Sequence, residues 1–330
     1  MGAGLTDLFA QPSGSTPKIV IAVEQKSDFC VLPLTIAERK GYFAAEGIDV
    51  TVREWPQPGA ALQAVQTGAA QVLSGAYRHA LEQPVKGQPL VAFVLQGRTP
   101  QLVLGVSQKS IPHFKGLRDL RGRRVGVTGM QSASHRVAKL LLGQAGLAVP
   151  NEVQYLGLSS PTEAVTAFHS GDIDAICFDE PVITLLEQSG ALRVVADTRT
   201  VRGCAEVFGG PMPAGCLSAP ADFVNDQEMV CQALAHAMVH ALKWLQTAGP
   251  SDIIKTVPEP FFMGDRALYL AAFSRAREAW TPDGLMPPLG PETAARVWLG
   301  ESPKRSGERL NLSRTYTNAF ARRAKLRFKA

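Results

Sequence analysis

The sequence predicts a two-lobed α/β protein, and three observations lead to that prediction. The chain has 330 residues, which is too long for one average core and fits two α/β units. Strand and helix patterns alternate along about the first 200 residues, an order typical of parallel sheets flanked by helices. The segment LQAVQTGAAQVLS (62–74) parallels VTAFHSGDIDAIC (165–177), each running helix, glycine, strand. This repeat, offset by 103 residues, predicts two similar lobes, each with a mostly parallel sheet.

The first set of elements begins with an apolar strand at residues 18–23. Residues 48–52 alternate apolar and polar side chains, as a half-buried strand does. The nearly all-apolar run 90–95 predicts a strand buried on both faces. The remaining elements of this set are helices at 33–40 and 60–67 and a short strand at 71–73.

The second set repeats the same alternation. Its helix at 161–170 has Pro161 in the first turn, where a missing N–H is tolerated, and stops at Gly171. The other predicted elements are strands at 102–106, 124–127, 153–155, 175–178 and 193–195 and helices at 134–142 and 181–188.

Beyond Thr200 the strand signals become sparse. The Gly/Pro-rich segment 204–220 suits a crossing between the lobes. A long helix is predicted from Asp226 onward, and two more at 267–279 and 293–299. We expect these late helices to cover the first lobe, which has few helices of its own.

Composition and charge narrow the class of function. Apolar residues make up 45% of the chain and charged residues 19%, as in ordinary globular proteins. No run approaches the ~20 apolar residues that cross a bilayer. The net charge of +5 comes from residues 301–330, which hold nine Lys/Arg and two Glu. Because the basic character is confined to this tail, and no nucleic-acid-binding motif is present, we expect no nucleic-acid partner.

Cofactor motifs are absent from the sequence. The five cysteines form no CxxC pair, and neither a GxGxxG nor a Walker pattern occurs. We therefore expect neither a metal nor a nucleotide cofactor. Residues 1–17 are rich in Gly, Ser and Pro and lack the basic and apolar regions of a signal peptide, so we expect a disordered or tag-like segment there.

The loops at the carboxyl ends of the predicted strands are the candidate ligand site, because parallel α/β lobes bind ligands there. Residues 128–135 lead directly into a helix, with Ser132 or Ser134 as its cap. Free N–H groups and the helix dipole at such a position favour an anion. An anion site and an ordinary helix cap both fit this loop.

Two other features could carry chemistry. Asp179 follows a buried strand and fits a helix N-cap before Pro181, and it also fits an acceptor for an amine or ring N–H of a ligand. Cys30 with His79 is the strongest enzyme alternative, since a thiol nucleophile needs a base. No catalytic motif surrounds Cys30, so we favour a buried cysteine and a solvent-exposed histidine, and we expect no enzyme activity.

Four segments of the chain resemble one family of proteins. They are PLTIAERKGYFAAEGIDVTV (33–52), DLRGRRVGVTGMQSASHRVAKLLLGQAGL (119–147), PTEAVTAFHSGDIDAICFDEP (161–181) and NLSRTYTNAFARRA (311–324). In this order they resemble the nitrate/sulfonate/taurine class of ABC-transporter substrate-binding proteins, the NMT1/THI5-like family. The resemblance runs from about residue 18 to residue 324, nearly the whole chain.

The resemblance implies a periplasmic-binding-protein fold of type II with a two-segment hinge. Lobe one would comprise residues 18–104 and 212–330, and lobe two residues 105–211. It also implies a periplasmic, monomeric component of an ABC importer, which captures a small organic anion (sulfonate, carboxylate or similar) or a related small molecule by hinge closure. The partners would be a membrane permease and its ATPase. The implied ligand-binding residues are Ser27, Asp28, Phe29, Ser74, Gly75, Ala76, Tyr77, Met130, Gln131, Ser132, Ser134, Asp179 and Met212.

The chain departs from the common family pattern at Tyr77-Arg78-His79, which is bulkier and more basic, and at Cys30. Two alternatives on the same fold therefore stay open. One is an enzyme similar to the sulfinate desulfinases, with Cys30 as nucleophile. The other is a pyrimidine-precursor binding or forming protein, although the pyrimidine-forming enzymes carry a Cys-rich motif that this chain lacks.

Overall fold

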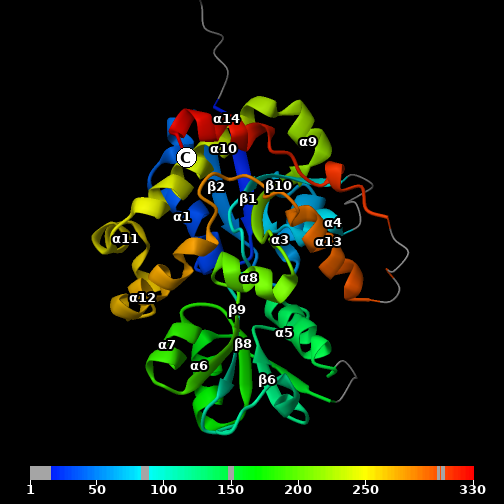
Figure 1. Cartoon of the computed structure of the whole chain (residues 1–330). Coiled ribbons are helices and arrows are strands. Elements are labelled where there is room, and N and C mark those ends of the chain that lie inside the picture. Colours follow the sequence, from blue (N-terminus) through cyan, green and yellow to red (C-terminus); the bar gives the residue numbers. More distant parts are fainter. Residues whose placement is uncertain (1–15, 83–88, 148–151, 303–304, 306–308) are drawn as a thin grey trace, which may run out of the picture.

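Two lobes, each built on one five-stranded sheet, make up the molecule (Figure 1). The structure, a computed structural model, describes residues 16–82, 89–147, 152–302, 305 and 309–330. Residues 1–15 of the predicted N-terminal segment lie outside this description, whereas the carbonyl of Pro17 accepts a hydrogen bond from Asp49 N at 2.9 Å. Among the described helices, none has the length and apolar character needed to cross a membrane.

The first sheet has the strand order β2-β1-β3-β10-β4. β1 is parallel to β2 and β3, while β10 is antiparallel to both of its neighbours, β3 and β4. The strands are β1 (Lys18–Val23), β2 (Asp49–Glu54), β3 (Val72–Ala76), β4 (Leu90–Leu95) and β10 (Gly215–Pro220).

The second sheet follows the same plan, with the order β7-β6-β8-β5-β9. β6 is parallel to β7 and β8, and β5 is antiparallel to β8 and β9. The strands are β5 (Val103–Ser107), β6 (Arg124–Val127), β7 (Gln154–Gly157), β8 (Ala175–Phe178) and β9 (Leu192–Asp197).

Both sheets are mixed, but four of the five strands in each run in the same direction, so the prediction of mostly parallel sheets is confirmed. Each contains one reversed strand, β10 in the first and β5 in the second. The cause is the crossing between lobes. The chain leaves the first sheet at the end of β4 and enters the second directly as β5, so β5 runs away from the crossing while β8 runs toward it.

The repeat seen in the sequence has a structural counterpart. Helix α3 (Ala60–Gln66) precedes β3, and helix α6 (Pro161–Ser170) precedes β8. β3 and β8 hold the same third place in their sheets. The two-lobed prediction is therefore confirmed element by element.

Helices from both ends of the chain cover the first sheet. α10 (Glu228–Thr247) buries an apolar stripe against α1 (Leu32–Arg39) and α14 (Ala319–Phe328). The late helices therefore cover the first lobe as expected. The other helices of this lobe are α2 (Tyr42–Ala45), α4 (Arg78–Leu81), α9 (Ala221–Asp226), α11 (Pro250–Thr256), α12 (Arg266–Ala276) and α13 (Gly290–Gly300), with the 3-10 turns η1 (Phe29–Val31), η3 (Glu259–Phe262), η4 (Arg277–Ala279) and η6 (Leu312–Arg314).

The second sheet is flanked by α5 (Ala133–Gln144), α6, α7 (Val182–Gln188) and α8 (Val201–Phe208), with η2 (Leu117–Leu120) before β6 (Figure 1). The segment 204–220, which was expected to suit a crossing, contains the end of α8, the passage between the lobes and all of β10. Thr200 caps α8 by accepting a hydrogen bond from Gly203 N at 3.0 Å, and Gly209 ends it at φ 72°. Two short crossings result, at residues 96–102 and 198–214. β5 begins at Val103, directly after the first crossing.

Candidate functional site

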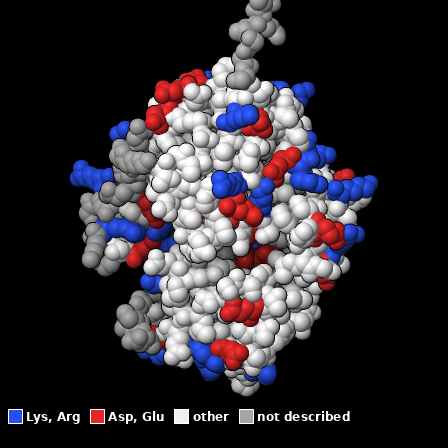
Figure 2. Space-filling view, turned by 180° about the vertical axis from the view of Figure 1, so that it is seen from behind, with Lys and Arg blue, Asp and Glu red and all other residues white. Residues whose placement is uncertain are grey.

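The carboxyl ends of four strands meet at the junction of the lobes. β4 ends at the first crossing, and β1 and β3 run parallel to it because β10 is antiparallel to β3 and β4. β8 ends at the same junction because it is antiparallel to β5, which starts there. We call this region, the ends of β1, β3, β6 and β8 with the two crossings, the interlobe face. Figure 2 shows acidic side chains at the waist between the lobes.

The loop after β1 presents Ser27, Asp28 and Phe29 in three different ways. Phe29 is buried, with its ring 4.8 Å from Tyr269 and stacked 6.4 Å from Trp280. Its carbonyl accepts a hydrogen bond from Trp280 Nε1 at 3.1 Å. Ser27 is exposed and Asp28 half-buried. Phe29 is therefore the anchor that fixes the position of Asp28.

Asp28 carries a free carboxyl group. It stands at the N-cap position of η1 but its side chain caps nothing, and it forms no hydrogen bond or ion pair with any described residue. Burial, together with the charges of Asp179, Glu24 and Glu54, raises its pKa to about 8. Asp179 belongs to the second lobe, so its charge acts on Asp28 from the other side of the junction.

Asp179, directly after β8, is the partner from the second lobe. The N-cap interpretation of this residue was wrong, because Pro181 holds the N-cap position of α7 and no side chain caps the helix. Burial and the neighbouring charge of Glu180 raise the pKa of Asp179 to about 6. Like Asp28, it bonds to no side chain in the described part of the chain.

Glu180 differs from its neighbour because it is neutralised inside the second lobe. Its carboxylate accepts hydrogen bonds from Thr184 N at 3.0 Å and from Arg199 Nη1 at 2.6 Å. Arg199 also pairs with Asp197 at 2.6 Å and with Glu187 at 3.0 Å. The buried arginine is thus fully engaged by three carboxylates and offers no charge to Asp179.

β3 extends further than its apolar pattern predicted. It runs through Ala76 because β10 pairs with it, Gly215 lying opposite Ala76 and Leu217 opposite Ser74. Ser74, Gly75 and Ala76 therefore belong to a strand at the interlobe face. Ser74 accepts a hydrogen bond from Gln96 Nε2 at 3.0 Å.

The Tyr77-Arg78-His79 segment does not present an unpaired basic side chain to the interlobe face. The Tyr77 ring is fully buried in the first lobe, and its hydroxyl lies 2.5 Å from Thr315 Oγ1, so it is a core side chain. Arg78 pairs with Glu82 and Glu301, each at 2.5 Å, and His79 Nδ1 lies 3.4 Å from Glu82.

The loop before α5 is a helix cap with its polar atoms bonded to one another. Ser132 is the N-cap and accepts from His135 N at 3.2 Å. Ser134 Oγ accepts from Thr128 N at 2.9 Å and lies 2.9 Å from Ser132 Oγ. Gln131, at φ 68°, donates its N–H to His135 Nδ1 at 2.9 Å. Met130 stays exposed at 56%.

Two residues of the interlobe face were missed by the sequence analysis. Gln96 and Gln101, at the ends of the first crossing, are 1% and 2% exposed. Gln96 Oε1 and both amide atoms of Gln101 have no hydrogen-bond partner among the described residues. The available signal was the segment LQGRTPQL (95–102), where two amides flank a Gly/Pro turn between buried strands.

Met212, on the second crossing, is half-buried and packs against apolar clusters of both lobes.

Cys30 and His79 are not brought together as a nucleophile and base. Burial and the charges of Asp28 and Asp179 raise the pKa of the partly buried Cys30 thiol well above its usual range. His79 contacts Glu82 instead. Within the described ranges there is also no group of three or more His, Cys, Asp or Glu side chains suited to a metal ion.

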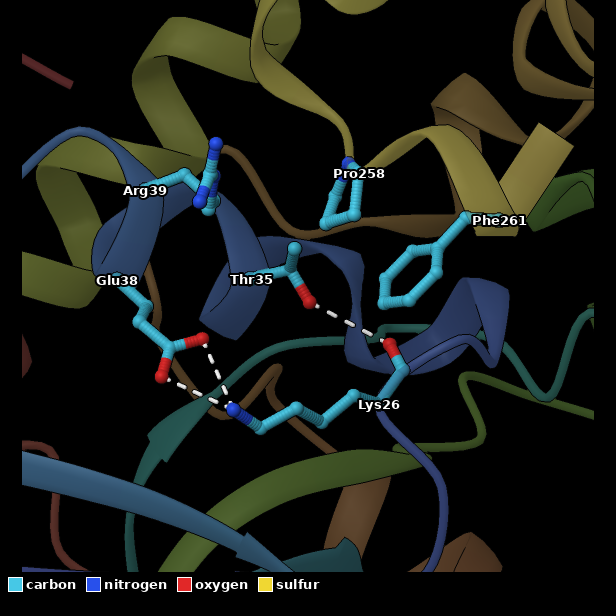
Figure 3. A pocket seen from close by; sticks show the side chains of 6 residues that line it. All are labelled: Lys26, Thr35, Glu38, Arg39, Pro258 and Phe261. Carbon is cyan, nitrogen blue, oxygen red and sulfur yellow. Dashed lines mark hydrogen bonds and ion pairs between the residues drawn. The ribbon is translucent and has the colours of Figure 1, made fainter.

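One hollow lies away from the interlobe face. It has a volume of about 480 Å³, opens beside α1 and η3, and is confined to the first lobe. Figure 3 shows Lys26 turned toward Glu38, whose two carboxylate oxygens are 3.0 and 3.1 Å from Lys26 Nζ. Its lysine is thus neutralised, and the hollow touches no residue of the second lobe.

A family assignment agrees with this architecture. The family model described as NMT1/THI5 like matches residues 28–205, more than half of the chain. The chain belongs to the NMT1/THI5-like family. The resemblance to this family is therefore confirmed, and three of the four sequence segments, 33–52, 119–147 and 161–181, lie within the matched residues.

Solved structures show how far the NMT1/THI5-like fold is shared. A protein of Bordetella bronchiseptica RB50 is 42% identical, with a TM-score of 0.84, over 95% of this chain and 98% of that one. The alkanesulfonate-binding protein SsuA of Xanthomonas axonopodis pv. citri, bound to MOPS, is 18% identical, with a TM-score of 0.66, over 93% and 100%. The desulfurization enzyme DSZB is 17% identical, with a TM-score of 0.63, over 94% and 99%. The fold is thus that of the periplasmic binding proteins, and it hosts both binding proteins and enzymes.

Proposed function

We propose that this protein is the solute-binding component of an ABC importer and that its lobes close on one small molecule at the interlobe face. The observation that carries the proposal is the pair Asp28 and Asp179. These carboxyls come from different lobes, the charge of Asp179 raises the pKa of Asp28, and neither carboxyl bonds to another described side chain. A ligand that contacts both lobes stabilises their closed arrangement, because its binding free energy is available only there.

Family membership supports this proposal, as does the fold shared with a sulfonate-binding protein that holds MOPS. Release to a membrane permease and its ATPase in the periplasm belongs to the same proposal. The organic anion expected from the resemblance would lie next to two carboxyls. The described residues therefore support capture between the lobes more strongly than they support an anionic solute.

The test is a solute screen with three readouts. Each solute is first tested for a rise in melting temperature, and those that raise it are then examined by small-angle X-ray scattering. We expect the stabilising solute to lower the radius of gyration and to be recovered chemically unchanged by mass spectrometry. Stabilisation without compaction would contradict closure of the lobes, and conversion of the solute would contradict a carrier.

The enzyme alternative is tested at Cys30. We expect Cys30→Ala to retain solute affinity within about twofold, because a thiol with a raised pKa is a poor nucleophile and only the thiolate attacks. Isothermal titration calorimetry measures the affinity, and an aryl sulfinate serves as the trial substrate. Turnover of the sulfinate by the wild type that Cys30→Ala abolishes would favour the desulfinase alternative.

A further inference from the structure

We infer that the solute is a nitrogen base, an amine, amidine or amino-substituted heterocycle, whose N–H groups bind between Asp28 and Asp179. The inference rests on the proposed function and specifies the chemical class of its ligand. It differs from the organic anion that the family resemblance implies.

The acidic side chains near the junction differ in whether they have a partner within the protein. Other acids near the junction have partners within the protein. Glu180 and Glu187 are held by Arg199, and Glu301 by Arg78. Asp28 and Asp179 alone contribute carboxyls from opposite lobes to the interlobe face without a bonded partner among the described residues. A pair of free carboxyls needs a partner that carries protons or positive charge.

Gln96 and Gln101 are two buried amide side chains at the first crossing. Gln96 lies at the first crossing, directly after β4. Its Nε2 donates to Ser74 Oγ in the middle of β3, and its Oε1 has no partner among the described residues. Gly215 lies between Gln96 and the segment that follows Asp28. A Cβ added to Gly215 would be 3.7 Å from the carbonyl oxygen of Cys30 and 3.9 Å from the Cβ of Gln96. Gln96 therefore lies beside the backbone two residues beyond Asp28.

Gln101 occupies the matching position in the second lobe. Val103 lies opposite Phe178, so the next antiparallel pair toward the crossing is Leu102 with Asp179. Gln101 follows immediately, 2% exposed, with both amide atoms unpartnered. Buried amides without partners are rare in folded proteins, and a ligand that carries both N–H donors and a ring nitrogen would satisfy them.

An anionic solute would need a cationic side chain near the junction that is free to bind it. Arg136, on α5, donates to the carbonyl of Gln131 and lies 3.8 Å from Glu301. Arg199 is held by three carboxylates and Lys26 by Glu38. The start of α5 is capped by Ser132. Arg98, on the first crossing, donates its Nε to the carbonyl of Glu278 at 2.7 Å. These four side chains therefore already have partners within the protein.

The experiment compares two sets of probes by isothermal titration calorimetry at pH 7. The first set is benzamidine, agmatine and 4-aminopyrimidine, and the second is ethanesulfonate, nitrate and benzoate. We expect a member of the first set to bind. Binding of a cationic probe, benzamidine or agmatine, should release protons, measured by titration in two buffers of different ionisation enthalpy, because a cation beside Asp28 lowers the raised pKa of its carboxyl.

The variants Asp28→Asn and Asp179→Asn should each weaken that binding by about tenfold or more, because each removes a charge-assisted hydrogen bond. Asp226→Asn is the matched control, since Asp226 is exposed at the end of α9, and its affinity should equal that of the wild type. Circular dichroism and the melting temperature verify that each variant is folded.

The possible failures are distinguishable. An anion that binds and compacts the protein, with Asp28→Asn binding it equally or more tightly, would overturn the nitrogen base and leave the import proposal standing. If neither probe set compacts the protein, and native mass spectrometry finds no co-purified solute, both the inference and the proposed function fall.

Discussion

At the residue scale, three neighbouring side chains that the sequence placed in one ligand site have separate roles. Phe29 packs against Tyr269 and Trp280, Ser27 is exposed, and Asp28 is the half-buried member, with a carboxyl that caps nothing. Tyr77 shows the same limit, since its ring lies in the core with Thr315. A sequence pattern identifies the loop that lies at the junction, but the direction of each side chain depends on contacts with residues more than two hundred positions away.

Replacing the anchor should test this division of roles. Phe29→Ala should lower the free energy of unfolding by about 3–5 kcal/mol, because it leaves a cavity beside Tyr269 and Trp280. Urea unfolding followed by circular dichroism measures the change. Ser27→Ala, at an exposed position, is the control and should change stability by less than about 0.5 kcal/mol. Equal effects of the two changes would show that Phe29 is not an anchor.

At the element scale, local signals predicted the helices and strands but not the directions of all strands. The strands β4, β6 and β8 and the helix α6 have the predicted bounds. α6 is typical: Ser160 caps it by accepting from Glu163 N at 3.2 Å, and Gly171 ends it at φ 88°. β10 was missed as a strand because its place between β3 and β4 depends on pairing with residues about 140 positions earlier, which no local period records.

Gly203 offers a test of how α8 is attached to the second lobe. A Cβ at this position would lie 1.9 Å from the backbone oxygen of Asp197 at the end of β9. We therefore expect Gly203→Ala to destabilise the protein by about 1–3 kcal/mol or more, since helix and strand must move apart. Chemical unfolding measures the change.

The control for this substitution is another helical glycine. Gly300, at the end of α13, has nothing within 4 Å of its Cβ position. Gly300→Ala should be neutral or stabilise by up to about 1 kcal/mol through helix propensity. If Gly203→Ala behaved in the same way as Gly300→Ala, α8 would not be held as closely against β9 as the structure shows.

At the scale of the whole molecule, the two lobes touch through charges on both sides of the junction. Arg275 of α12 pairs with Glu187 of α7, and Arg136 of α5 lies 3.8 Å from Glu301 after α13. The N–H of Val201 also donates to Glu278 at 3.2 Å. Such exposed pairs contribute little free energy each, about 0–1 kcal/mol. The equilibrium between the open and closed forms should therefore depend on the protonation of the two carboxyls inside the junction, Asp28 and Asp179.

This balance should depend on pH. Closing raises the pKa of Asp28 to about 8 and that of Asp179 to about 6, whereas opening exposes both carboxyls to water, where the ordinary value is near 4. The closed form thus holds more protons between about pH 4 and pH 8, so closure weakens as the pH rises through this range. In the solute-free protein we expect a larger radius of gyration at pH 9 than at pH 5 by small-angle X-ray scattering. The double variant Asp28→Asn/Asp179→Asn should keep one radius at both pH values. A wild-type radius that does not change with pH would contradict the raised pKa values, because burial of the charged carboxyls and repulsion from neighbouring acids both oppose closure as protons leave.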